Sequence, residues 1–224
     1  MFPVNRSTHL SSGLNMSQFF IIHADNPQLR LIKQAAELVR KGAVIVYPTD
    51  SGYALGCHLG DKDAVMRIRK IRGLDDKHLM TLVCRDLSEI AHYARVDNVQ
   101  FRLLKSNTPG SYTFILDATK EVPKRLQHPK RNTVGLRIPD HPVALALLAE
   151  LGEPLLSSSL ILPGEETTMH DAEEINELLA NQVDLVIDGG PVGLEPTTVI
   201  DLTGTTAVLI RRGKGDITPF SIEE

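Results

Sequence analysis

The sequence is poor in residue types that many specialised sites need. It has no tryptophan, and aromatic residues make up 4% of its 224 residues. A surface on which single-stranded bases stack is therefore poorly supplied. Only two cysteines occur, Cys57 and Cys84. They cannot form a disulfide framework or a four-cysteine zinc site, and they are typical of small buried residues in a reducing compartment, so we expect a cytoplasmic protein.

Several motifs are absent as well. No run of twenty apolar residues occurs, so the sequence predicts no membrane span. The eight histidines lack zinc-ligand spacing, and we expect no dedicated metal site. There is no G-x-x-x-x-G-K-[ST] loop, no G-x-G-x-x-G turn and no G-x-S-x-G elbow. No histidine or lysine is placed to activate Ser157-Ser158-Ser159, so these hydroxyls are interpreted as hydrogen-bonding groups.

Charge is distributed unevenly along the chain. Residues 1–149 carry 21 Lys and Arg against 13 Asp and Glu, whereas residues 150–224 carry 3 against 15. Between positions 120 and 137 only Glu121 opposes a group of cations, which we call the basic segment: Lys120, Lys124, Arg125, Lys130, Arg131 and Arg137. The basic segment suits contact with nucleic-acid phosphates. The alternative is a solvated surface that the acidic C-terminal part balances.

The pattern of apolar residues predicts a single domain over residues 17–220. Strands are expected near 19–22, 44–47, 79–84, 111–116, 134–138, 154–158, 183–187, 198–202 and 208–211. Helices are expected near 27–39, 61–70, 86–93, 97–105, 143–151 and 172–180, the first of them started by Asp25-Asn26-Pro27 with Pro27 at the first helical position. Because strands and helices do not alternate strictly, we expect an α/β fold with a mixed, twisted sheet. Residues 1–16 are interpreted as a disordered tail or an over-long gene start, with Met16 as the initiator.

Polar residues recur where predicted strands end. The strand at 44–47 is expected to run into a polar loop from Thr49 to Tyr53. Hydroxyls, glycines or cations also adjoin later strands: Arg137, Ser157–Ser159, Gly189-Gly190, Thr197-Thr198 and Arg211-Arg212. Ligands of α/β proteins bind beyond the carboxyl ends of strands. The sequence therefore predicts a phosphate cradle without a P-loop, although each segment alone is also ordinary turn or surface chemistry.

Several short motifs of the chain, taken in their order along the sequence, resemble those of the YrdC-like family over about residues 19–216. The stretch Pro48-Thr49-Asp50-Ser51-Gly52-Tyr53-Ala54-Leu55-Gly56 resembles the family's P-T-E-T-x-Y-G-L-G, and Lys70-Ile71-Arg72 its K-x-R. Further matches are 109–113 to P-G-x-x-T, 135–142 to G-x-R-x-P-D-H-P, 188–191 to D-G-G-P, 196–201 to P-S-T-V-x-D and 212–213 to the terminal R-x-G. Each motif alone is weak, but together and in order they are specific.

The resemblance implies a twisted open mixed sheet with helices on both sides and a large concave basic cavity. It also implies L-threonylcarbamoyladenylate synthesis, in which L-threonine, bicarbonate and ATP give threonylcarbamoyl-AMP and pyrophosphate for tRNA modification. ATP would be a substrate and would bring its own Mg²⁺. Double-stranded RNA and tRNA are further partners that the resemblance implies.

Site residues follow from the same resemblance. Lys70 and Arg72 are expected to be catalytic and to hold phosphates. Thr49, Tyr53 and Arg137 are expected to bind substrate. Arg137 would contact either the carboxylate of L-threonine or a phosphate of the nucleotide. The nucleotide is expected to contact Lys70, Arg72, Thr113, Ser157, Ser159, Thr197, Thr198 and Arg212.

One position departs from the pattern of active members, which carry S-x-N. Here Ser159-Leu160-Ile161 stands at that place, so Ile161 replaces an asparagine that offers both donors and an acceptor. This loss is typical of the YciO branch, which the chain resembles most. Two alternatives to the synthase therefore stay open: a non-catalytic RNA- or nucleotide-binding protein on the same fold, and related adenylate chemistry on another amine.

Overall fold

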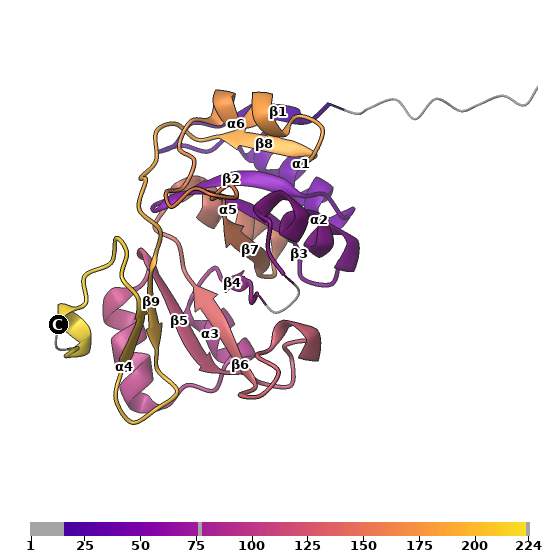
Figure 1. Ribbon diagram of the computed structural model, residues 1–224. Helices are drawn as coiled ribbons and strands as arrows, with labels where there is room; N and C mark the ends of the chain where they lie inside the picture. Colours follow the sequence, from indigo (N-terminus) through magenta and orange to yellow (C-terminus); the bar gives the residue numbers. More distant parts are fainter. Residues whose placement is uncertain (1–15, 76–77, 223–224) are drawn as a thin grey trace, which may run out of the picture.

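All strands in the described part of the chain belong to one mixed sheet (Figure 1). The computed structural model describes residues 16–75 and 78–222, so the predicted tail at 1–15 lies outside the described residues. The sheet order is β1-β8-β2-β3-β7-β4-β6-β5-β9-β10. The strands are β1 (Gln18–Ile21), β2 (Ile45–Thr49), β3 (Gly52–His58), β4 (Thr81–Val83), β5 (Tyr112–Asp117), β6 (Thr133–Arg137), β7 (Leu155–Ser159), β8 (Leu185–Asp188), β9 (Thr198–Asp201) and β10 (Val208–Arg211). Parallel and antiparallel pairs both occur, which confirms the predicted mixed sheet.

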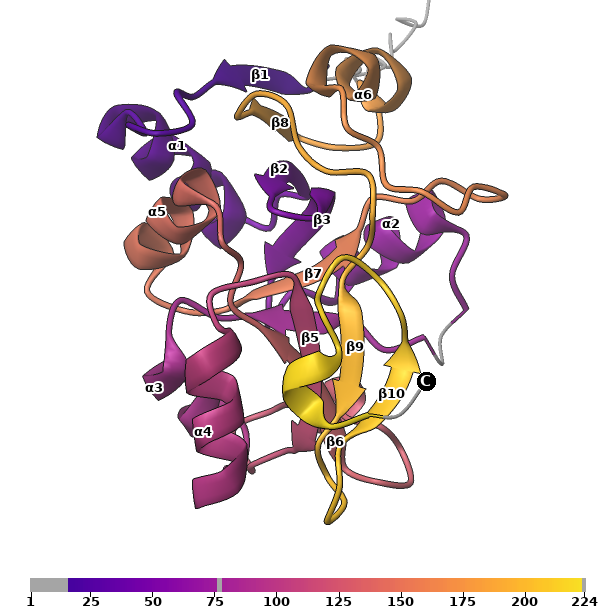
Figure 2. The ribbon, with the colours of Figure 1, turned by 90° about the vertical axis from the view of Figure 1, so that its left-hand side faces the viewer.

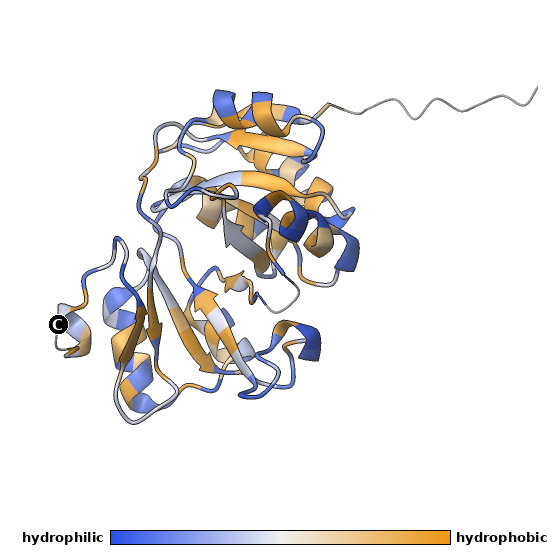
Figure 3. Cartoon of the chain, in the orientation of Figure 1, coloured by the Kyte–Doolittle hydropathy of each residue, from blue (hydrophilic) through white to orange (hydrophobic). Residues whose placement is uncertain are grey.

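Helices cover both faces of the sheet (Figure 2). They are α1 (Leu29–Arg40), α2 (Lys62–Arg72), α3 (Leu87–Tyr93), α4 (Asn98–Asn107), α5 (Pro142–Leu151) and α6 (Ala172–Leu179), with 3₁₀ turns at Lys124–Leu126 and Thr218–Phe220. Helix α1 buries Ile32, Ala35, Ala36 and Val39, the helical spacing of one apolar face. This face packs with α5 in one core, whereas α2, α3, α4 and α6 contribute to the other. Figure 3 shows hydrophobic colouring along β8 and β5 and hydrophilic colouring on α2.

The strands that form the site alternate between a buried face and a polar face. Phe114 of β5, Leu136 of β6 and Ile200 of β9 are fully buried in the core. The residues on either side of them point to the opposite face, because successive side chains alternate across a sheet. That opposite face carries Thr113, Gly135, Arg137 and Val199, which line a cavity.

Two boundaries differ from the sequence-based prediction. The expected polar loop after residue 47 is a two-residue turn, because Gly52–His58 forms a second strand, β3, that pairs antiparallel with β2. Small residues in β3 leave it without a β-branched signature, and both of its faces are buried. Helix α1 begins at Leu29 rather than at Pro27, and its N-cap residue is Gln28, whose side chain makes no capping bond.

The C-terminal segment after β10 lies tightly against β9, and this contact leads to a prediction. A Cβ atom on Gly213 would overlap the backbone of Pro196 and Thr197, which cannot give way like a flexible side chain. We expect Gly213→Ala to lower the free energy of unfolding by about 1–3 kcal/mol, measured by urea denaturation. The matched control is Gly204→Ala, because the nearest atom to a Cβ there lies 3.6 Å away. Equal stability of the two variants would contradict this packing.

Candidate functional site

A cavity of about 410 Å³ lies on the face of the sheet opposite to the core residues Phe114, Leu136 and Ile200. Residues from seven adjacent strands, β3, β7, β4, β6, β5, β9 and β10, line it together with Arg72 of α2. A volume of this size is typical of a small-molecule site. The sequence-predicted residues that line the cavity are Arg72, Thr113, Arg137, Ser157, Ser159 and Thr197.

Of the four arginines that line this cavity, three lie at the ends of elements: Arg72 at the end of α2, Arg137 at the end of β6 and Arg211 at the end of β10. The fourth, Arg131, forms an ion pair with Asp201. Burial and the charge of Arg211 lower the pKa of Arg72. Burial and the charge of Arg137 lower the pKa of Arg211. Among the described residues, neither Arg72 nor Arg211 forms an ion pair with a carboxylate. The cavity therefore carries net positive charge that an anionic ligand would neutralise.

Neutral oxygens orient these two arginines. Arg72 Nε donates to the Ser158 hydroxyl at 3.2 Å. Arg211 Nη2 donates to the carbonyl of Thr197 at 2.9 Å and to its hydroxyl at 3.2 Å. The Thr197 hydroxyl also lies 2.9 Å from that of Thr113. Arg211, Thr197 and Thr113 thus form a connected row of donors on one wall of the cavity.

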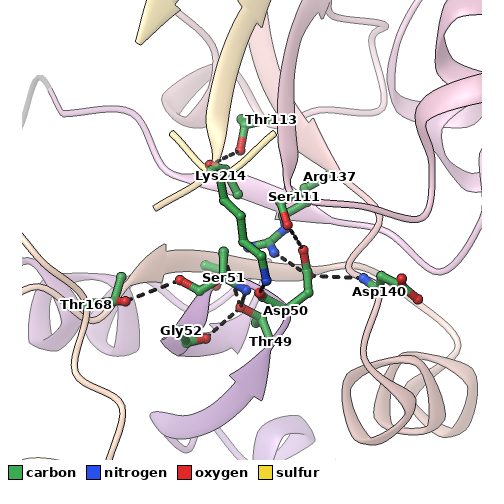
Figure 4. Close-up of polar contacts among 12 residues, drawn as sticks. Thr49, Asp50, Ser51, Gly52, Ser111, Thr113, Arg137, Asp140, Thr168 and Lys214 are labelled. Atoms are coloured by element: carbon green, nitrogen blue, oxygen red, sulfur yellow. Dashed lines mark hydrogen bonds and ion pairs between the residues drawn. The ribbon is translucent and has the colours of Figure 1, made fainter. Parts of the chain in front are cut away.

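The third arginine is held by a carboxylate in the turn between β2 and β3 (Figure 4). Asp50 accepts a hydrogen bond from Arg137 Nη2, from the Ser111 hydroxyl and from the backbone amide of Asp140. The carbonyl of Asp50 accepts a further bond from Lys214 Nζ, which reaches down from the C-terminal segment. The turn is therefore fixed by four residues from three separate parts of the chain.

The predicted substrate residues Thr49 and Tyr53 do not line the cavity. Thr49 is buried, and its hydroxyl donates to the carbonyl of Gly52 at 2.6 Å within the turn. The Tyr53 hydroxyl donates to the carbonyl of Gly190 at 3.1 Å. Burial raises the pKa of Tyr53, so its hydroxyl is neutral at pH 7. Both side chains brace the backbone around the turn in this conformation.

Three of the predicted nucleotide residues also lie outside the cavity lining. Lys70 is exposed on α2, and Arg212 is exposed beyond the end of β10. Thr198 is fully buried, where its hydroxyl donates to the carbonyl of Gly215 at 2.7 Å and accepts from the amide of Gly213. Ser157 lines the cavity, but its hydroxyl donates to the carbonyl of Leu55 and lies 2.8 Å from that of Tyr47. The ligand-binding roles of these residues stay predictions.

Two polar cavity residues, Arg211 and Ser158, belong to strand-end segments of the predicted cradle but received no ligand-binding role of their own from the sequence. Strand β10 has an irregularity in its pairing with β9 between Leu209 and Arg211. Such a bulge changes the face on which the following side chain lies, so a simple alternation could not separate Arg211 from Arg212. The run of three serines, Ser157–Ser159, indicated hydroxyl groups at this strand end. It did not indicate which of the three faces Arg72.

Apolar side chains form the rest of the cavity wall. Ile161 lines it beside Ser159, so the position at which the sequence departs from the family pattern is a cavity position. Met80, Ile115, Val199 and Ile210 contribute further apolar surface. The cavity thus combines a cationic part with an apolar part, which suits a ligand with an anionic group on a less polar body.

The basic segment is partly neutralised by contacts within the protein. Arg125 donates to the carbonyls of Leu59 and Gly60. Arg131 pairs with Asp201 at 2.9 Å, and Arg137 pairs with Asp50. Its three lysines remain exposed: Lys120, Lys124 and Lys130.

Within residues 16–75 and 78–222, no three His, Cys, Asp or Glu side chains gather where they could hold a metal ion. No helix in the same part of the chain has the length and apolar character needed to cross a bilayer.

The Asp50 environment predicts a specific acid sensitivity. Burial alone would raise the pKa of Asp50, but Arg137 and the bonds from Ser111 and Asp140 outweigh it, so the pKa is lowered. A lowered pKa stabilises the fold above the group's ordinary pKa, and this stabilisation is lost as the pH falls through the folded value. Below about pH 5 we therefore expect urea-unfolding free energies of the wild type to fall more steeply than those of Asp50→Asn. Parallel curves for the two proteins would contradict the prediction.

Comparison with known protein families and sequences gives a consistent result. The Sua5/YciO/YrdC family model, described as telomere recombination, matches residues 37–213. The uncharacterized protein YciO of Escherichia coli K12 is 64% identical over 205 residues, which cover 92% of this chain and 100% of YciO. The threonylcarbamoyl-AMP synthase of Bacillus subtilis is 31% identical over 204 residues, which cover 90% of this chain and 57% of the synthase.

Solved structures agree with these relatives. The crystal structure of E. coli YciO matches with a TM-score of 0.89 at 64% identity, covering 92% of this chain and 100% of that one. The crystal structure of P. abyssi Sua5 complexed with L-threonine matches with a TM-score of 0.80 at 26% identity, covering 88% of this chain and 58% of that one. The expected fold is therefore confirmed.

Proposed function

Because this chain belongs to the Sua5/YciO/YrdC family, we propose that its cavity binds an adenine nucleotide and that it is an enzyme similar to threonylcarbamoyl-AMP synthases. One observation carries the proposal. Arg72 and Arg211 face the cavity without a carboxylate partner among the described residues, although their mutual repulsion and burial disfavour such a pair of charges. Two neighbouring guanidinium groups without counter-charges repel each other, and a polyanionic ligand bound between them would offset this repulsion.

The proposed reaction needs positioning and charge neutralisation more than acid–base chemistry. The amine of L-threonine and bicarbonate form a carbamate with loss of water, and a carbamate oxygen attacks the α-phosphorus of ATP. The bond from the α-phosphorus to the bridging oxygen breaks, and pyrophosphate leaves. Arg72 and Arg211 would neutralise the phosphates, and Thr197 and Thr113 would donate to phosphate oxygens. ATP would bring its Mg²⁺.

The direct test is calorimetric titration of the protein with ATP and with AMP, in the presence of L-threonine and bicarbonate, followed by measurement of pyrophosphate release. Binding with release of pyrophosphate would show that Ile161 is compatible with synthesis. Binding without release would leave a nucleotide-binding relative, and other amines would then replace L-threonine in the assay. Absence of both ATP and AMP binding would overturn the proposal.

Binding of structured RNA is the second candidate, and the exposed lysines of the basic segment favour it. If Lys120, Lys124 and Lys130 each contact one phosphate, the logarithm of the association constant should fall with the logarithm of salt concentration at a slope of about −3. Filter binding of a tRNA between low and physiological salt measures this slope. A flat dependence, or an unchanged slope after replacing all three lysines with alanine, would count against RNA binding at this surface.

A further inference from the structure

Asp50 connects elements that lie on different sides of the site. It lies in the turn between β2 and β3. The groups that donate hydrogen bonds to its carboxylate are Ser111 just before β5, Arg137 at the end of β6 and the backbone amide of Asp140, two residues before α5. Both carboxylate oxygens are used, Oδ1 by Arg137 and the Asp140 amide and Oδ2 by Ser111. Asp50 is therefore occupied by the protein itself and is not available as a ligand-binding group.

Arg137, in contrast, has donors to spare. It is about as buried as Asp50, with 6% of its side chain exposed against 8%, and it lines the cavity. Its Nη2 donates to Asp50, but in the part of the chain that the structure describes, Nε has no hydrogen-bond acceptor. A buried N–H group without an acceptor is unfavourable, so an oxygen atom of a ligand at this place would be stabilised.

The three arginines therefore differ in what they provide. Arg72 and Arg211 are oriented by neutral oxygens and keep their full charge. The charge of Arg137 is balanced by Asp50, so Arg137 supplies directed hydrogen bonds rather than net charge. We propose that Asp50 is a positioning residue, and this inference rests on the proposed nucleotide site. Asp50 holds Arg137 by Nη2 and so directs the remaining N–H groups of Arg137 at the anionic group of the ligand.

The test is a double-mutant cycle on AMP affinity, measured by calorimetry with Asp50→Asn, Arg137→Gln and the variant carrying both. If Asp50 acts through Arg137, each single change weakens AMP binding by about tenfold or more. In the Arg137→Gln background, Asp50→Asn then has no further effect. Asp50→Glu keeps the charge and should recover part of the affinity. The control is Asp140→Asn, which removes an exposed carboxylate next to the pair but leaves the backbone amide that contacts Asp50.

The outcomes separate this inference from the proposed function. A wild-type protein that binds neither AMP nor ATP refutes the nucleotide site itself. If the wild type binds AMP and Arg137→Gln binds equally well, the site stands but the role of Asp50 is refuted. Additive losses in the cycle would mean that Asp50 acts by holding the turn and not through Arg137. Circular dichroism and thermal unfolding of each variant show whether it is folded. The double variant removes both charges of the Asp50–Arg137 pair, so it covers the case in which a single variant does not fold.

Discussion

Replacing Arg137 with alanine should lower the free energy of unfolding by about 3–5 kcal/mol, because it leaves the Asp50 carboxylate buried without its counter-charge. Urea denaturation at pH 7 measures this loss. The matched control is Arg67→Ala, which also removes an arginine that pairs with an aspartate, Asp184, at 2.8 Å. Both side chains of that pair are 40% exposed, so no carboxylate is left buried and we expect a loss of about 1 kcal/mol or less.

The cause of the loss can be checked by removing the second partner as well. Asp50→Ala in the Arg137→Ala background removes the stranded charge, and we expect it to restore part of the stability that Arg137→Ala loses. A loss for Arg137→Ala no larger than that for Arg67→Ala would show that the buried pair is unimportant for folding.

Replacing Arg72 or Arg211 with alanine should weaken nucleotide binding without lowering stability, in contrast to the loss of stability expected for Arg137→Ala. Each change should weaken ATP and AMP binding by about ten- to a hundredfold, because it removes a charge-assisted hydrogen bond to a phosphate. Stability should stay the same or rise, since each arginine is bound only to neutral oxygens and lies close enough to a neighbouring arginine to be repelled by it. Residues that serve binding at the expense of stability show this combination.

Calorimetry and urea denaturation on the same samples measure both quantities. The control is Lys62→Ala, which removes an exposed cation from the first turn of the same helix, α2. Its effect on nucleotide affinity should stay within about twofold at physiological salt, because exposed charges at a distance are screened. If Arg72→Ala and Arg211→Ala bind nucleotide like the wild type, the ligand does not lie against these arginines.

Much of the sheet could be predicted because its strands have clear patterns. Val134, Leu136 and their alternating neighbours indicated β6, and the ordered motifs indicated the family and its fold, which the structural matches confirm. Strand β3 was hidden because glycine and alanine give no strand signal and its side chains are buried on both faces. The start of α1 was misplaced by two residues, since capping patterns are weak compared with packing of the apolar face.

The site was less predictable than the fold because motif membership does not tell which way a side chain points. Thr49 and Tyr53 belong to a motif at the edge of the site, but their hydroxyls are bonded to the backbone around the turn. Arg211 and Arg212 are neighbours in sequence, and only the irregular pairing of β10 places Arg211 in the cavity. Such choices depend on contacts between residues far apart in the chain, which no local pattern contains.

The residues that contact Asp50 are synthesised long after Asp50 itself, so the contacts of this turn form late in translation. Asp50 is synthesised 87 residues before Arg137 and 164 residues before Lys214, and strand β1 can pair with β8 only after residues 185–188 have been made. A nascent chain can therefore form the β2–β3 hairpin early, but it cannot complete the arginine site until almost all of the protein has been made. Fragments released before that point would lack part of the proposed ligand-binding surface, so nucleotide binding at this site would distinguish the finished protein from its fragments.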